Sequence, residues 1–142
     1  DEKILKYVRS VDEVWHAGDI GTTAVADGIS KLKMIRGVYG NIDGHELRSQ
    51  FSENQIFSCD GVKVLMTHIG GYPGKYNQRI RAEIKQSAPQ IFIAGHSHIL
   101  KVQWDKSIQC MHLNPGACGV SGFHHMRTML RFSITGYRVY ML

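Results

Sequence analysis

The sequence has few cysteines and no apolar run long enough to cross a membrane. Its three cysteines, Cys59, Cys110 and Cys118, lie far apart and form no CxxC pair. This usage favours a reduced protein with free thiols and a cytoplasmic location. A membrane-spanning helix needs about 20 consecutive apolar residues, and the chain has no such run. The charged start, DEKILKYVRS, has the pattern of an amphipathic helix and not of a signal peptide.

Linkers, repeats and low-complexity segments are also missing, and only three prolines occur. The 142 residues therefore predict a single domain over 1–142, with enough hydrophobic residues (43%) for a core. The net charge of +5 is compatible with an anionic substrate, and a solvated basic surface is the preferred explanation of it. No stripe of basic residues alternates with aromatic ones, so a nucleic-acid partner is not indicated except as a substrate.

The order of the predicted elements favours an α/β fold. Helices are expected over 2–10, 22–32, 44–49 and 75–86. Strands are expected over 13–17, 33–39, 55–59, 62–67, 91–94, 107–113, 127–134 and 136–142. Asp60-Gly61 is a strong hairpin signal between two of them, and the runs 13–17 and 91–94 are expected to be buried. Helices alternate with strands at first and strands dominate later, which predicts a layered α/β sandwich with a mixed sheet.

Polar residues follow several of the predicted strands. The strand ends carry Gly18-Asp19, Gly40-Asn41, Thr67-His68 and Gly95-His96. Ligands bind outside the carboxyl ends of strands in open α/β sheets, so Asp19, Asn41, His68 and His96 are expected at one rim. This mixture of oxygen and nitrogen donors suits manganese, iron, zinc, nickel or cobalt.

The segment His96-Ser97-His98 adds a second histidine to the predicted site. In an extended segment, side chains two residues apart point to the same side. Two neighbouring ions could then each take one histidine, as in hydrolases that hold two metals about 3.5–4 Å apart. Asp19 has two carboxylate oxygens and could bridge such a pair.

The fragments GDIG, GNID, THIGG, GHSH and LNPGA occur in this order over almost the whole chain. They resemble the ordered motifs of the calcineurin-like metallophosphoesterases, and the short length resembles the small bacterial and archaeal phosphodiesterase branch. The resemblance implies that Asp19 bridges two metals, that Asn41, His68 and His96 hold one of them, and that His98 holds the other. It also implies hydrolysis of a phosphoester, with a diester favoured, by a metal-activated water. Manganese is the expected metal, and a small phosphoester is the expected substrate.

One motif of that family is not found near the start. The family opens with a strand that ends in Asp-x-His and supplies ligands to the metal that His98 also binds. Here Asp1 is followed by Glu2 and Lys3. We therefore expect the first strand of the family to be absent from this chain, and we expect the second metal to bind more weakly.

Other residues near the motifs leave alternatives open. Asp43 stands where many relatives carry a histidine that protonates the leaving group. It is counted among the catalytic candidates, where it would orient a ligand or contact substrate, and a solvated or capping carboxylate is the alternative. His16 is interpreted as strand packing or as a neighbour of a ligand. Asn114 is interpreted as part of a turn near the site, with support of a ligand histidine as the alternative.

Two further classes compete with an enzyme. One eukaryotic branch of the same family is a subunit of a protein-sorting coat that has lost catalytic residues, so a catalytically impaired scaffold is the main alternative. The intact His96 and His98 argue against it. A larger protein phosphatase is disfavoured by the 142-residue length. Formation of a homo-oligomer is left open.

Overall fold

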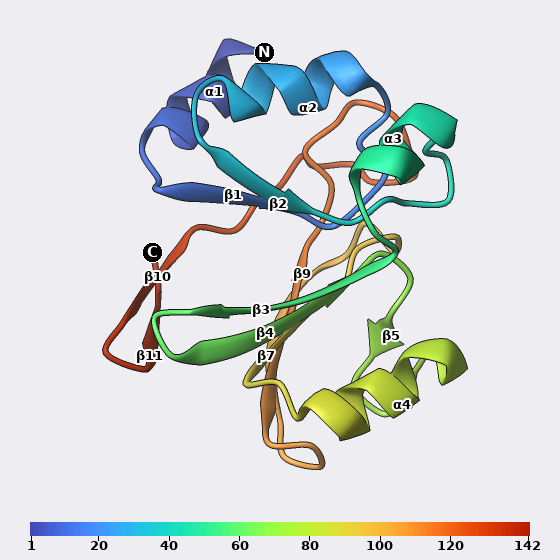
Figure 1. The fold of residues 1–142 in the computed structure, drawn as a ribbon, viewed down its shortest axis with the longest axis vertical. Coiled ribbons are helices and arrows are strands. Elements are labelled where there is room, and N and C mark those ends of the chain that lie inside the picture. Colours follow the sequence, from blue (N-terminus) through green and yellow to red (C-terminus); the bar gives the residue numbers. More distant parts are fainter.

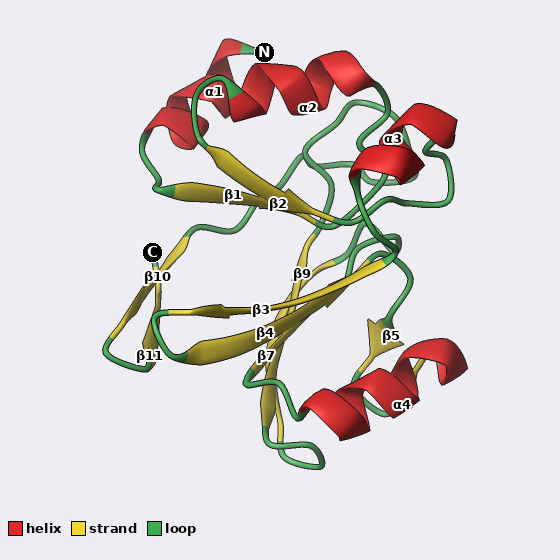
Figure 2. Cartoon of the chain, in the orientation of Figure 1, coloured by secondary structure: helices red, strands yellow, loops and turns green.

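Helices and sheets alternate in layers in the computed structural model, which describes residues 1–142 (Figure 1). Helices α1 (Glu2–Arg9) and α2 (Thr23–Ser30) lie outside a parallel sheet formed by β1 (Glu13–His16) and β2 (Met34–Gly37). A five-stranded sheet follows, and α4 (Gln78–Ser87) lies on its outer side (Figure 2). The expected layered α/β sandwich is confirmed.

The larger sheet is mixed, as expected. Its order is β3-β4-β7-β9-β8, with β4, β7 and β9 parallel and with both outer pairs antiparallel. The predicted hairpin at Asp60-Gly61 joins β3 to β4, with Cys59 opposite Val62. The strands are β3 (Asn54–Cys59), β4 (Val62–Thr67), β7 (Ile91–Ile93), β8 (Leu100–Asp105) and β9 (Cys110–Pro115).

Smaller elements complete the fold. Helix α3 follows β2, a short ribbon of β5 and β6 precedes α4, and a hairpin of β10 and β11 lies at the C-terminal end. Their bounds are α3 (His45–Gln50), β5 (Gly71–Tyr72), β6 (Lys75–Tyr76), β10 (Phe132–Thr135) and β11 (Arg138–Met141).

Strand β4 supplies core residues to both faces of the large sheet. Val62, Val64 and Met66 pack into a cluster that includes residues of β7, β9 and the ends of β1 and β2. Leu65 points to the opposite face and packs with Ile80 of α4. All of these side chains are buried, and each contributes roughly 1.5–3 kcal/mol relative to an exposed position. This two-sided burial fixes β4, and therefore the position of His68 directly after it.

Several predicted boundaries are wrong. The helix expected from residue 75 begins at Gln78, because the Asn77 side chain caps it and accepts the backbone N–H of Arg79 at 3.0 Å. Residues 75–76 form β6 instead. The strand expected over 107–113 begins at Cys110, and residues 107–109 belong to the turn that joins it to β8. Strand β8 itself was not predicted.

The predicted strand over 127–134 begins only at Phe132. The strand expected to be buried near residue 13 is half-buried along its length. The strands also do not form one sheet, since β1 pairs only with β2. The metal-binding candidates therefore come from the ends of strands in two sheets.

Candidate metal centre

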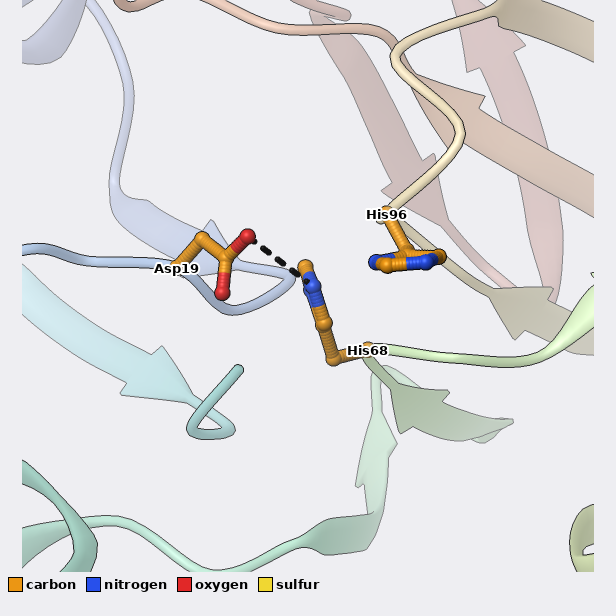
Figure 3. A group of neighbouring side chains, drawn as sticks. All are labelled: Asp19, His68 and His96. Carbon is orange, nitrogen blue, oxygen red and sulfur yellow. Dashed lines mark ion pairs between the residues drawn. The ribbon is translucent and has the colours of Figure 1, made fainter. Parts of the chain in front are cut away.

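The four residues predicted at the strand ends lie near one another. Asp19 lies in the loop after β1, Asn41 follows β2, His68 directly follows β4, and His96 lies in the loop after β7. Ligand atoms of Asp19, His68 and His96 all lie within 4.8 Å of one another (Figure 3). Asn41 joins this group, because its Oδ1 lies 3.0 Å from His68 Nε2.

His68 is the buried centre of the group. Its Nδ1 lies 2.7 Å from the carbonyl oxygen of Ala17, which can only accept a hydrogen bond. Nδ1 therefore carries a proton, and in the neutral ring the lone pair of Nε2 faces the site. Metal-binding histidines commonly donate their other ring N–H to a carbonyl in this way.

The atoms around His68 Nε2 are those of a cation site. Asp19 Oδ2 lies 3.2 Å from this nitrogen, and Asn41 Oδ1 lies 3.0 Å from it. Lone pairs of two oxygens and one nitrogen therefore converge, with the exposed His96 ring next to them (Figure 3). A divalent ion balances such a set of donors, and the mixed donors suit a first-row transition metal or zinc.

Glycines allow the two loops of the site to approach closely. A Cβ atom on Gly40 would lie 2.0 Å from Asp19 Oδ1 and 2.2 Å from Asp19 N. A Cβ atom on Gly18, whose φ is +95°, would lie 2.5 Å from His68 Nδ1. Both positions therefore require glycine for the observed distances between ligands.

Asp43 is buried beneath these loops and faces backbone groups. Its carboxylate accepts N–H bonds from Ile20, Gly21 and Gly40 at 2.8–3.1 Å. Burial raises the pKa of Asp43, but these backbone bonds outweigh it and hold the pKa below the ordinary value. Asp43 thus ties the Asp19 loop to the Asn41 loop through backbone N–H groups.

His98 lies outside the group formed by the other predicted ligands. Its Nδ1 is 3.2 Å from Nδ1 of His124, a residue to which the sequence motifs gave no role. Ser97, between the two histidines, accepts a bond from the buried Asn114 side chain. Asn114 also donates to the carbonyl oxygen of Gly95, so it fixes the loop that carries His96 and His98.

His16, at the end of β1, lies close to the site. The charges of Asp43, His68 and Asp19 act on its ring, but burial has the largest effect and lowers the pKa of His16. Its Nδ1 is buried without a partner. The position fits the predicted role as a neighbour of the ligands.

A cavity of about 630 Å³ opens beside the metal ligands. Asn41 and His68 belong to its wall, together with Tyr39, Arg48 and Arg79. Glu53 also lines it, so two guanidinium groups face the cavity against one carboxylate. The sequence analysis did not identify these arginines, because nothing in the motifs indicates which helices flank the site.

The two arginines differ in how they are held. Arg48 donates to the backbone oxygens of Asp43 and Asn41, and its guanidinium carbon lies 4.7 Å from the centre of the Tyr39 ring. The Arg79 guanidinium has no hydrogen bond or salt bridge within the chain. Arg48 therefore supports the Asn41 loop, whereas Arg79 is free to bind an anionic group.

Fold and donor set together define an α/β domain with a candidate metal site beside an arginine-lined cavity. The sequence matches the calcineurin-like phosphoesterase superfamily domain over residues 1–136. The chain belongs to this family, as its motifs predicted.

Relatives share the fold at low sequence identity. A "Probable metallophosphoesterase" of Methanothermobacter thermautotrophicus is 25% identical over 97 residues, covering 68% of this chain. The match covers 56% of that protein, so the chain spans little more than half the length of this curated relative.

Two solved structures extend the comparison. Vps29 of Entamoeba histolytica, solved with Zn²⁺, superposes with a TM-score of 0.74 at 17% identity over 98% of this chain and 79% of that one. A novel archaeal phosphodiesterase superposes with a TM-score of 0.61 at 22% identity over 82% and 79% of the two chains.

None of the helices has both the length and the apolar character that a membrane span requires.

Proposed function

We propose that this domain is a metal-dependent phosphodiesterase. One observation carries the proposal: Asp19 Oδ2 and Asn41 Oδ1 lie 3.2 and 3.0 Å from His68 Nε2, beside an arginine-lined cavity. Membership in the phosphoesterase family supports a hydrolase. Similarity to an archaeal phosphodiesterase supports a diester substrate.

The proposed function gives each site residue a separate role. Asp19, Asn41, His68 and His96 would hold one ion, and Asp19 with His98 would contribute to a second. Bound metals lower the pKa of water and neutralise charge on a phosphoryl group. The His68–Ala17 bond keeps the Nε2 lone pair available, and Asp43 holds the two ligand loops at fixed separation.

The cavity accounts for substrate binding in this proposal. A phosphodiester placed at the metal ligands would extend one ester group past Asn41 and His68 into the cavity of about 630 Å³. Arg79 would bind negative charge on the substrate, and the Tyr39 ring would contact an apolar or aromatic ester group. A small diester fits this volume, and manganese remains the proposed metal.

The test is hydrolysis of bis(p-nitrophenyl) phosphate with Mn²⁺, beside the monoester p-nitrophenyl phosphate. We expect faster turnover of the diester, and loss of turnover with a chelator. His96→Ala should lower turnover by more than about 100-fold, because even residues that only support a ligand are worth 10–100-fold. The control is His125→Ala, which removes an exposed histidine that contacts none of these residues. Activity that survives both the chelator and His96→Ala would rule out a metal mechanism.

A protein-interaction role is the second candidate, and β8 favours it. Leu100, Val102 and Trp104 alternate along this edge strand and are each 45–48% exposed. The fold shared with Vps29 points the same way. Chelator-resistant, His96-independent capture of one protein partner, lost in Trp104→Ala, would favour this role over catalysis. A cytoplasmic location is also part of the proposal, and the three free cysteines in the structure are compatible with it. Formation of a homo-oligomer is left as a proposal.

A further inference from the structure

The pair formed by His98 and His124 has the form of a metal site of its own. The two Nδ1 atoms lie 3.2 Å apart, and the ring centres lie 5.0 Å apart at an angle of 77°. His98 belongs to the loop after β7, whereas His124 lies in the irregular segment between β9 and β10. Both residues are half-buried, so an ion from solvent can reach them.

A hydrogen bond fixes the protonation of His124. Its Nε2 lies 2.9 Å from the carbonyl oxygen of Gly119, which accepts the N–H. Nε2 therefore carries a proton, and in the neutral ring the lone pair of Nδ1 points toward His98. The arrangement is the same as that of His68 with Ala17, with the two ring nitrogens exchanged. A backbone carbonyl thus orients each histidine with one bare nitrogen toward its site.

Gly122 makes the close approach of the two rings possible. A Cβ atom there would lie 2.4 Å from His98 Cε1 and 2.5 Å from His98 Nδ1. It would also lie 3.0 Å from His124 Nδ1. The φ of Gly122 is +129°, a value that other residues rarely adopt. The sequence thus leaves a space with no side chain next to both Nδ1 atoms.

The nitrogen separation suits one shared ion. Two histidine nitrogens bound at 2.0–2.1 Å in tetrahedral geometry lie roughly 3.4 Å apart. The observed separation is 3.2 Å, and a small rotation of either ring would bring it to this value.

We propose that His98 and His124 together bind a divalent transition metal or zinc, and that His124 is a ligand supplied by the segment between β9 and β10. The proposal deepens the proposed function, because His98 is the residue assigned there to the second metal. It rests on metal binding alone, which is measured without any substrate.

Co²⁺ titration of the full chain, followed by visible absorption, tests the proposal. Wild type should show a Co²⁺ site that persists in His68→Ala. His124→Ala should weaken that site by at least about tenfold, and Gly122→Ala should weaken it similarly because the added methyl group separates the rings. His125→Ala is the matched control, since it removes the adjacent exposed histidine and should titrate like wild type.

Thermal melting of the metal-free variants separates a lost ligand from a lost fold. Equal Co²⁺ affinity in wild type and a folded His124→Ala variant would overturn the proposal, as would the loss of all Co²⁺ binding in a folded His68→Ala. In these cases the pair is joined only by a histidine–histidine hydrogen bond. A Co²⁺ site that depends on His124 in a protein without diesterase activity would support the inference while refuting the proposed function.

Discussion

Acid should destabilise this protein in part through a buried histidine in β9. His112 is 1% exposed, and neither of its ring nitrogens has a hydrogen-bond partner. It packs against Phe92 and Tyr76, with ring centres 5.6 and 5.8 Å away. Burial, with a smaller contribution from the charge of Lys101, lowers the pKa of His112 to about 4. The folded protein therefore keeps this ring neutral under conditions in which the unfolded chain protonates it.

The sign and size of the effect follow from linkage. In the unfolded chain, His112 binds a proton below its ordinary pKa of about 6.5. The contribution of neutral His112 to the unfolding free energy is therefore fully present above that pH and is lost as the pH falls from about 6.5 to 4. The interval between these two pKa values corresponds to about 3 kcal/mol of unfolding free energy. His112→Leu removes the titrating group, and the apolar side chain has no nitrogen to leave unpaired. The variant should lose much less stability across this interval.

Urea unfolding of metal-free protein, followed by circular dichroism from pH 8 to pH 4, measures this loss. His125→Leu is the control and should follow the wild-type curve, because His125 is exposed. Parallel stability curves for wild type and His112→Leu over the whole interval would refute the argument. They would mean that other groups account for any sensitivity to acid.

Three further predictions concern the site. Gly40→Ala should lower both the melting temperature and the metal affinity, measured by calorimetry, because its methyl group would lie 2.0 Å from Asp19 Oδ1; an unchanged affinity would show that the loops move apart freely. Arg79→Ala should raise the KM for a charged diester several-fold and leave kcat unchanged, whereas an equal loss in kcat would give Arg79 a role in the chemical step. Asp43→Ala should cost about 3 kcal/mol or more in urea unfolding, because two buried N–H groups, of Ile20 and Gly40, and the part-buried N–H of Gly21 lose their acceptor; a cost below about 1 kcal/mol would show that water replaces it.

The sequence predicted the elements whose local signals are strong. Asp60-Gly61 correctly marked the hairpin of β3 and β4, and the positions of Asp19, His68 and His96 after strands correctly predicted that they meet. Residue patterns report which segments are strands, but they do not report which strands pair. For this reason the separation of β1 and β2 from the large sheet was not predicted.

Local side-chain caps and one long-range contact account for the rest of what the sequence missed. The start of α4 depends on the Asn77 cap, and the end of β8 depends on Asp105, which accepts bonds from Ser107 in the following turn. The contact of His98 with His124 joins segments 26 residues apart, and no periodic pattern leads to the second of them. A long-range contact of this kind is determined by how packed elements are placed, and the motifs contain no information about that placement.

The donor atoms of the metal centre bridge two sheets that share no backbone ladder. His68 belongs to the large sheet, while Asp19 and Asn41 belong to the ends of the small one. An ion bound among them would act as a cross-link, adding about 2.7 kcal/mol of stability at a concentration 100 times its dissociation constant. Conversely, any substitution that shifts the sheets against each other, such as a smaller side chain at Trp15 in the interface core, changes the ligand spacing at a distance. Metal affinity would then report changes in the relative position of the two sheets.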